Sequence, residues 1–293
     1  WKSNLILSLF LVIGVTGVSL RVYATHIEPY RVKTRTETLN TLKPGTDVTI
    51  LHFTDLQTNE ISDYEQEIFS RFKKLKPDLI LNTGDLLQIY DGHTFENELN
   101  KLDSELRVIN PPLGIYGVYG DVDRHLRNIN LRKIGSMSLL ENEEKVIKTS
   151  AGEIRIFFLS VELSKSMGDT RGEVMKWING IDTESFLIVC GHSPDYILDI
   201  KDLPVDLCLA GHTHGGQVRM PFAGAIMTLS NVPKSWARGF RKVGNTILNV
   251  SAGLGCEHAD NIPRIRFNCP PELTIIQVRS SQDQLPEPFF PTP

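Results

Sequence analysis

Six polar side chains stand just after apolar, strand-like segments, and this placement constrains the fold more than any other feature of the sequence. They are Asp55, Asp85, Asp121, His192, His212 and His214. A single Asp after a strand is usually a turn residue or a helix cap. Six candidates at five successive strand ends are hard to explain in that way. Because the carboxyl ends of strands form the ligand crevice of open α/β sheets, we expect these side chains to converge.

The order of strand-like and helix-like segments predicts the fold class. Strand-like runs at 48–53, 78–83 and 114–119 alternate with helical patterns at 64–75, at 95–109 and from residue 124 onward. Further strand-like runs follow at 153–161, 185–190, 205–210, 246–251 and 272–278, with a helix expected at 174–179. The pattern is α/β in its first part and more purely β in its second. We therefore predict one α/β domain over residues 47–279.

The ends of the chain differ in character from this domain. Residues 3–20 carry no charge, and a span of about 20 mostly apolar residues is what a transmembrane helix needs. We interpret residues 1–23 as a membrane anchor and 24–46 as a polar tether. A signal peptide cleaved near Val22-Tyr23-Ala24 is the alternative, which the nearby Arg21 disfavours. Basic residues on both sides of the apolar run leave the orientation open. Residues 280–293 are Pro-rich and predict a tail.

Charge disfavours one class of protein, and the cysteines fall into two kinds. The chain has 31 Lys and Arg against 35 Asp and Glu, a net charge of −4, which disfavours sequence-independent nucleic-acid binding and hence a nuclease. Cys190 and Cys208 lie in apolar runs and are expected in the core. Cys256 and Cys269 lie in loop sequence and could form a disulfide. Free thiols are the preferred interpretation, because the sequence contains no disulfide framework.

The chemistry of the six side chains indicates a pair of metal ions. They offer carboxylate oxygens and imidazole nitrogens and no thiolate, which suits Mn²⁺, Fe or Zn²⁺ better than a structural zinc site or a calcium site. Six ligands exceed the needs of one catalytic metal. Two ions about 3.5 to 4 Å apart can clamp the attacking and leaving oxygens of a displacement at phosphorus. One carboxylate must then bridge the ions, and Asp85 is the best candidate.

The motifs that contain these residues resemble those of the calcineurin-like metallophosphoesterases. They read Asp55-Leu56-Gln57, Gly84-Asp85, Gly120-Asp121-Val122-Asp123, Gly191-His192 and Gly211-His212-Thr213-His214. The resemblance covers roughly residues 47–279. It implies a four-layer α-β-β-α sandwich, in which two facing β-sheets are flanked by helices, here with an N-terminal transmembrane helix.

The form GHTHGGQ at 211–217, together with the apolar N-terminus, looks like the membrane-associated bacterial branch of that family. That branch includes cell-envelope phosphodiesterases and a UDP-2,3-diacylglucosamine pyrophosphatase of lipid A synthesis. The resemblance therefore implies a protein of the bacterial inner membrane that acts on a phosphorylated small molecule or lipid. No obligate protein partner is evident from the sequence.

The resemblance also implies how two ions would share the ligands. One ion would take Asp55, Gln57, Asp85 and His214, and the other would take Asp85, Asp121, His192 and His212. Two of these positions depart from the family pattern, because Gln57 replaces a ligand histidine and Asp121 replaces an asparagine. Both changes retain or add oxygen donors. We therefore expect Mn²⁺ or Mg²⁺ to be preferred over zinc.

A third departure removes the usual general acid. Val122 stands where the family has a histidine that contacts the substrate phosphate and can protonate the leaving group. Such help is typically worth about 10²- to 10⁴-fold and matters most for a basic alkoxide leaving group. We therefore expect a pyrophosphate bond or an activated diester to be cleaved better than a simple alkyl ester. His125, one helical turn further on, is the candidate substitute acid.

Four arginines and one apolar stretch complete the candidate substrate contacts. Arg238, Arg241, Arg264 and Arg266 could meet substrate phosphates, since Arg pairs well with phosphate oxygens. Residues 220–227 (MPFAGAIM) could border a lipid-binding mouth, although buried packing explains them as well. We predict a membrane-anchored hydrolase of phosphodiester or pyrophosphate bonds. A catalytically degenerate scaffold with the same fold is the alternative, and a nuclease is a weaker one.

Overall fold

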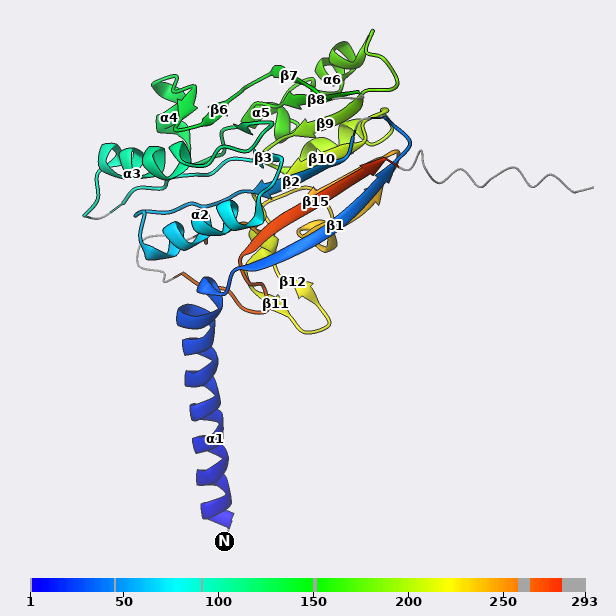
Figure 1. Ribbon diagram of the computed structural model, residues 1–293. Helices are drawn as coiled ribbons and strands as arrows, with labels where there is room; N and C mark the ends of the chain where they lie inside the picture. The colour runs from blue at the N-terminus through cyan, green and yellow to red at the C-terminus, as the bar shows by residue number, and fades with distance from the viewer. Residues whose placement is uncertain (1, 45, 91, 150–151, 258–263, 281–293) are drawn as a thin grey trace, which may run out of the picture.

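Two mixed β-sheets form the folded body of this computed structural model, which describes residues 2–44, 46–90, 92–149, 152–257 and 264–280 (Figure 1). One sheet has seven strands in the order β1-β15-β2-β3-β4-β6-β5, and the other has six in the order β13-β14-β10-β9-β8-β7. Strands β11 and β12 form a separate hairpin. The predicted Pro-rich tail lies outside the described residues except for Ser280, which ends β15.

The strands of the first sheet are β1 (Lys33–Thr41), β2 (Val48–Phe53), β3 (Leu79–Asn82), β4 (Ile115–Gly117), β5 (Lys133–Ile134), β6 (Met137–Leu139) and β15 (Glu272–Ser280). Those of the second sheet are β7 (Glu143–Lys148), β8 (Glu153–Phe158), β9 (Phe186–Cys190), β10 (Leu207–Ala210), β13 (Gly239–Val243) and β14 (Thr246–Val250). The hairpin pairs β11 (Arg219–Met220) with β12 (Gly224–Ala225). Strands β2, β3 and β4 run parallel, as do β9, β10 and β14.

The α-helices are α1 (Lys2–Val22), α2 (Asp63–Leu75), α3 (Phe95–Arg107), α4 (Arg124–Asn128), α5 (Val161–Ser164), α6 (Thr170–Ile178) and α7 (Ile197–Ile200). Five shorter helical turns are η1 (Tyr23–Ile27), η2 (Glu28–Tyr30), η3 (Pro194–Tyr196), η4 (His214–Gly216) and η5 (Lys234–Trp236). Helices α2 to α4 accompany the first sheet and α5 to α7 the second (Figure 1).

Three buried apolar layers separate these elements. The first packs α2 and α3 against the seven-stranded sheet, the second lies between the two sheets, and the third packs α6 and α7 against the six-stranded sheet. Strand β2 shows how one strand serves two layers: Ile50 joins the inter-sheet core and Leu51 the helix-facing core. This follows from the period-two alternation of strand side chains. The predicted four-layer α-β-β-α arrangement is confirmed.

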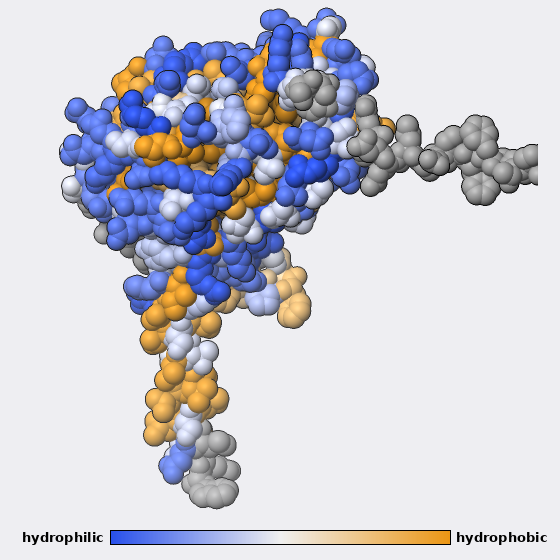
Figure 2. Space-filling view, in the orientation of Figure 1, coloured by the Kyte–Doolittle hydropathy of each residue, from blue (hydrophilic) through white to orange (hydrophobic). Residues whose placement is uncertain are grey.

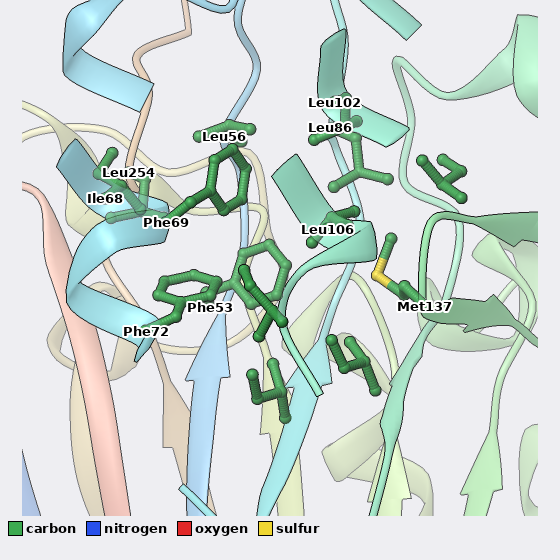
Figure 3. Packing of buried hydrophobic residues seen from close by; sticks show 14 of the residues in the cluster. Phe53, Leu56, Ile68, Phe69, Phe72, Leu86, Leu102, Leu106, Met137 and Leu254 are labelled. Atoms are coloured by element: carbon green, nitrogen blue, oxygen red, sulfur yellow. The ribbon is translucent and has the colours of Figure 1, made fainter. Parts of the chain in front are cut away.

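Helix α2 illustrates why the helical patterns fold as predicted. Ser62 and Glu65 form a reciprocal capping box at its N-terminus, and Lys76 ends it in a left-handed conformation. Its apolar residues recur on one face and pack against β2, where the Phe53 and Phe72 rings lie 5.0 Å apart between centroids (Figure 3). This packing fixes the end of β2, from which the first site loop leaves.

The N-terminal segment forms a helix that leaves the folded body. Helix α1 is exposed along its described length (Figures 1 and 2). It is long and apolar enough to cross a membrane, and a signal sequence can have the same length and composition. The segment that follows differs from the predicted tether. Residues 33–41 form β1, an edge strand parallel to β15, so part of that segment belongs to the folded body. The polar sequence of residues 33–41 did not predict a strand, because an edge strand is exposed on one side and needs no apolar run.

All four cysteines are buried. Cys190 and Cys208 lie in the cores, as predicted. Cys256 and Cys269 form no disulfide, in agreement with the preferred interpretation of the sequence.

Candidate metal centre

The loops that follow the parallel strands bring the predicted ligands to one place. Two groups of side chains have ligand atoms within 4.8 Å of one another. They are Asp55, Asp85 and His192, and Asp121, His192 and His212. His192 Nε2 lies 3.3 Å from Asp85 Oδ2 and 3.6 Å from Asp121 Oδ2. His214 Nε2 lies 3.7 Å from Asp55 Oδ1, so it joins the same cluster. Side chains from the loops after β2, β3, β4, β9 and β10 thus meet across both sheets.

The backbone at these positions is unusual. Five of the seven predicted ligand residues have positive φ angles of 40° to 67°, a region that non-glycine residues seldom adopt. They are Asp55, Gln57, Asp85, His212 and His214. Such conformations cost of order 1–3 kcal/mol each and cluster at functional sites. The fold therefore maintains these loops in a geometry that local preference alone would not select.

Two motif glycines leave space for the carboxylates. A Cβ on Gly120 would collide with the Asp85 carboxylate, and a Cβ on Gly211 would collide with Thr54 and Asp55. Any larger residue would therefore displace a carboxylate from the cluster.

Hydrogen bonds fix which nitrogen of two histidines faces the cluster. His192 Nδ1 lies 2.8 Å from the carbonyl oxygen of Thr83, to which it can only donate. His212 Nε2 lies 2.8 Å from the carbonyl oxygen of Leu229. The lone pairs of His192 Nε2 and His212 Nδ1 are then left for a cation. This is the usual arrangement of metal-binding histidines.

Gln57 is turned toward the same cluster by a carboxylate that the sequence reading missed. Its Nε2 donates to Glu257 Oε2 at 2.8 Å. Because a carboxylate only accepts, this bond fixes the amide so that Oε1 points away from Glu257. Gln57 Oε1 is buried and has no hydrogen-bond partner among the described residues, and the same is true of His192 Nε2. Buried polar atoms without partners are rare. These two atoms therefore fit the ligand positions of a divalent cation.

The electrostatics of the cluster also fit cations. Burial would lower the pKa of His192, but the carboxylates of Asp85 and Asp121 outweigh it and hold that pKa well above its usual value. Burial raises the pKa of Asp55 to about 7, and the nearby Asp85 adds to the effect. The raised pKa values of both His192 and Asp55 show that the buried carboxylates need positive charge close by. Divalent ions would supply it.

Asp121 has a partner that the sequence reading did not identify. Lys165 Nζ lies 2.7 Å from Asp121 Oδ2, and His212 Nδ1 lies 3.1 Å from the same oxygen. Burial would raise the pKa of Asp121, but the neighbouring His192, His212 and Lys165 hold that pKa below its usual range. An ammonium group therefore stands at the rim of the candidate metal centre.

Asp123 connects two of the site loops through hydrogen bonds to their backbone. Its carboxylate accepts hydrogen bonds from the backbone nitrogens of Asp85, Leu86 and Gly120 at 2.8 to 2.9 Å. Burial and the charge of Asp85 raise its pKa to about 6. Asp123 thus joins the loops that carry Asp85 and Asp121.

The candidate acid His125 lies apart from the cluster. Its side chain is exposed, and its ring packs against Phe95 with 4.2 Å between centroids. Among the described residues, no hydrogen bond or ion pair links His125 to a candidate ligand. Val122 contributes through its backbone, because its N–H donates to Asp85 Oδ1 at 2.9 Å.

The four candidate substrate arginines differ in their surroundings. Arg266 is completely buried, and its guanidinium donates to the carbonyl oxygens of Ala252, Gly253, Gly255 and Cys269. This arrangement corrects the expectation for Arg266, which is a scaffold residue without access to substrate. Arg238 Nε pairs with Glu272 at 3.0 Å, and Arg241 donates to backbone carbonyls.

Arg264 contacts the loop after β2, with Nη2 3.4 Å from Thr58 Oγ1. It is half-buried. Of the four arginines, it remains the best candidate for a substrate contact.

An apolar cavity of about 370 Å³ adjoins the centre. Its walls include the candidate ligands His212 and His214, together with Glu257. The remainder is largely apolar and comes from Val218, Ile226, Met227 and Leu229. Part of the apolar stretch noted in the sequence therefore lines the approach to the cluster.

Comparison with known proteins agrees with this arrangement. The sequence profile of calcineurin-like phosphoesterases matches residues 48–216. The uncharacterized metallophosphoesterase YkuE of Bacillus subtilis is 29% identical over 269 residues, covering 88% of this chain and 90% of that protein. The phosphodiesterase YaeI of Escherichia coli is 27% identical and covers 69% of this chain and 71% of its own length.

The UDP-2,3-diacylglucosamine pyrophosphatase LpxG of Chlamydia muridarum is 24% identical, covering 87% of this chain and 92% of its own. Among solved structures, the NAD nucleotidase of Haemophilus influenzae is 14% identical, with a TM-score of 0.46, over 71% of this chain and 46% of that enzyme. That structural likeness is too low to compare the sites. The profile match covers more than half of the sequence, and the chain is therefore a metallophosphoesterase of the calcineurin-like phosphoesterase family.

Proposed function

We propose that this protein is a membrane-anchored hydrolase of a phosphodiester or pyrophosphate bond in a lipid or envelope precursor, such as UDP-2,3-diacylglucosamine. The observation that carries the proposal is the meeting of three aspartates and three histidines at the strand ends, with an apolar cavity beside them. Acidic and imidazole ligands in this density suit two divalent ions.

The proposed ligand sets follow the family pattern. One ion is held by Asp55, Gln57, Asp85 and His214, and the other by Asp85, Asp121, His192 and His212. When bound, the two ions supply Lewis acidity that activates water and neutralises charge on the phosphoryl oxygens. Mn²⁺ is the proposed metal, with Mg²⁺, Fe or Zn²⁺ as alternatives. The amide of Gln57 and the carboxylate of Asp121 favour a hard ion over zinc.

The residues near the candidate metal centre favour a leaving group that needs no proton. Val122 cannot donate a proton, and the exposed His125 is engaged with Phe95. A phosphate leaving group needs no proton at neutral pH, whereas an alkoxide does. The ammonium of Lys165, 2.7 Å from Asp121, stands where it can neutralise phosphate charge. A pyrophosphate or an activated diester is therefore the preferred substrate.

The lipid character of the substrate is proposed from two features. Helix α1 is apolar and exposed, and the cavity beside the cluster is lined largely by apolar side chains. The name of the Chlamydia relative specifies a diacylated pyrophosphate substrate. Helix α1 also supports the proposed location in the bacterial inner membrane, with the side of the membrane left open.

Two alternatives make different predictions. A degenerate scaffold would have lost ligands without regard to chemistry, yet both Gln57 and Asp121 retain oxygen donors. A nuclease would need a basic surface, which a net charge of −4 does not favour.

Substrate hydrolysis by the purified full-length protein tests the proposal. The protein in detergent, supplied with Mn²⁺, is compared on UDP-diacylglucosamine, on a phospholipid and on an aryl phosphodiester, with His214→Ala as the blank. We expect hydrolysis of the pyrophosphate to exceed that of the phospholipid. Absence of hydrolysis of all three, with no Mn²⁺ bound, would support the degenerate scaffold instead.

The role assigned to position 122 has its own test. Val122→His should raise the hydrolysis of an alkyl diester by at least about 10-fold while changing pyrophosphate hydrolysis little. Equal effects on both substrates would contradict the argument from the leaving group.

A further inference from the structure

The hairpin formed by residues 218–229 exposes an unusual number of large apolar side chains. Phe222 at its tip is fully exposed, and four others are 47 to 66% exposed: Met220, Ile226, Met227 and Leu229. Phe222 also has a φ of 67°, which is costly for a bulky residue. Neither packing nor local backbone preference accounts for a phenylalanine there. Clustered exposed apolar residues of this kind mark an interaction surface.

The hairpin lies on the side of the body from which α1 leaves. Figure 1 shows both projecting from the same side, and Figure 2 shows apolar surface on both. A cavity of about 350 Å³ confirms that they are close, since it is lined by Tyr23 at the end of α1 and by Pro221 of the hairpin. Arg31 and Lys33 line the same cavity.

A short chain of contacts fixes the hairpin relative to the helix. The buried Glu28, just after α1, accepts a hydrogen bond from Asn268 N at 2.9 Å and another from Cys269 N at 2.6 Å. The neighbouring Phe267 pairs with the start of the hairpin, because Arg219 N donates to its carbonyl oxygen at 2.9 Å. The position of α1 in a bilayer would therefore set the position of the hairpin.

The charge around the hairpin suits a lipid surface. The sequence contains no Asp or Glu from Leu207 to Cys256, whereas Arg219 lies at the base of the hairpin and Lys234 follows it. Lys234 Nζ donates to the carbonyl oxygen of Ile226 at 2.6 Å, which holds its ammonium against the apolar surface. Apolar side chains beside basic ones are typical of segments that lie in the membrane interface.

We propose that residues 218–229 dock into the lipid bilayer beside α1. This docking places the opening of the cavity next to the metal centre at the membrane surface. The substrate is then a lipid that carries its phosphoester in the headgroup. Its apolar part enters along Ile226, Met227 and Leu229, which line the cavity that also contains His212 and His214. The part of this inference that concerns the substrate rests on the proposed hydrolytic function, whereas the docking does not.

Depth measurements on the full-length protein test the docking. The protein is placed in nanodiscs of phosphatidylethanolamine and phosphatidylglycerol, with an environment-sensitive nitrobenzoxadiazole label on Phe222→Cys. The native cysteines are buried, which favours labelling at the new site. The matched control is Met167→Cys, which replaces another highly exposed apolar residue, located between α5 and α6 on the opposite side from α1.

We expect the label at 222 to emit at shorter wavelength and to be quenched by spin-labelled acyl chains, while the label at 167 shows neither effect. A label at 222 that emits as in water and escapes quenching would overturn the docking.

A comparison of two substrates tests the consequence for catalysis. The double variant Met220→Ser, Phe222→Ser alters the tip without changing a residue that lines the metal-site cavity. We expect kcat/KM for a lipid phosphodiester in vesicles to fall by about 10-fold or more, and that for the water-soluble bis-p-nitrophenyl phosphate to stay unchanged. Met167→Ser should leave both unchanged.

Equal losses on both substrates, or no loss on either, would refute the membrane path for the substrate. If the wild-type protein with Mn²⁺ hydrolyses neither substrate, the proposed function fails, and the label at 222 still decides whether the hairpin docks.

Discussion

Gln57 and Glu257 are 200 positions apart in the sequence, yet Gln57 Nε2 donates to Glu257 Oε2 at 2.8 Å. This bond orients the amide so that its buried Oε1 is left for a cation. Gln57 stands where the family has a histidine. The second ring nitrogen of a histidine could itself donate a hydrogen bond that fixes the ring. The glutamate supplies the orienting contact that a flexible amide requires.

Glu257→Ala should therefore weaken Mn²⁺ binding, because alanine offers no acceptor for Gln57 Nε2. Loss of an orienting partner typically costs about 10- to 100-fold in metal affinity. A Mn²⁺ titration followed by electron paramagnetic resonance measures the effect directly, without dependence on activity. Glu184→Ala, which removes an exposed carboxylate before β9, is the matched control. Unchanged affinity in Glu257→Ala would show that Gln57 needs no positioning.

Lys165→Gln should lower hydrolysis and leave metal content intact. The Lys165 ammonium lies 2.7 Å from Asp121, and a fixed charge near the reacting phosphate is worth about 10- to 100-fold in rate. Steady-state kinetics with metal analysis separates the two quantities. Lys176→Gln, on the exposed face of α6, serves as the control. Parallel loss of metal and activity would instead mean that Lys165 acts by holding Asp121.

His52 should make the fold sensitive to acid. It is buried between the sheets, with Nε2 2.9 Å from Thr83 Oγ1 and Nδ1 2.8 Å from Asn249 Nδ2. Burial, aided by the charge of Arg35, lowers its pKa to about 3. The unfolded state therefore binds a proton more readily, so stability is complete above about pH 6.5 and falls as the pH drops toward 3.

His52→Gln isolates this contribution. Between about pH 7.5 and about pH 4.5, the wild-type protein should lose about 3 kcal/mol more unfolding free energy than the variant. Guanidinium denaturation in detergent at the two pH values provides the comparison. The same pH dependence in both proteins would show that His52 has the same pKa in the folded and the unfolded state.

Arg266→Met should destabilise the fold. The buried guanidinium is bonded to four backbone carbonyls between β14 and β15. Removing it takes away the donor to the carbonyls of Ala252, Gly255 and Cys269, whereas that of Gly253 still accepts from Glu272 N. Loss of such a buried charged donor costs about 3–5 kcal/mol. Thermal unfolding measures it, with the exposed Arg171→Met as a control that should change little. A variant of normal stability with a raised KM would restore Arg266 to the role of a substrate contact.

The candidate centre was largely predictable because its signals are local. Asp55, Asp85 and His192 each follow an apolar strand, and the carboxyl ends of parallel strands meet at one edge of a sheet. The alternation of segments likewise predicted the α/β class, and the resemblance to the family implied the four layers. Strand β1 was missed because its exposed edge position needs no apolar sequence.

The sequence by itself determined the strand-end candidate ligands, the α/β class and the apolar N-terminal helix, since each follows from short-range patterns of polarity. Only the tertiary structure decided which distant residues serve those ligands. Glu257 contacts Gln57, Lys165 contacts Asp121, and the carbonyl of Thr83 orients His192. The partners in these contacts are 44 to 200 positions apart in the sequence. Such contacts depend on the order of strands in the sheets and on the course of the loops. No local pattern of residues encodes that order.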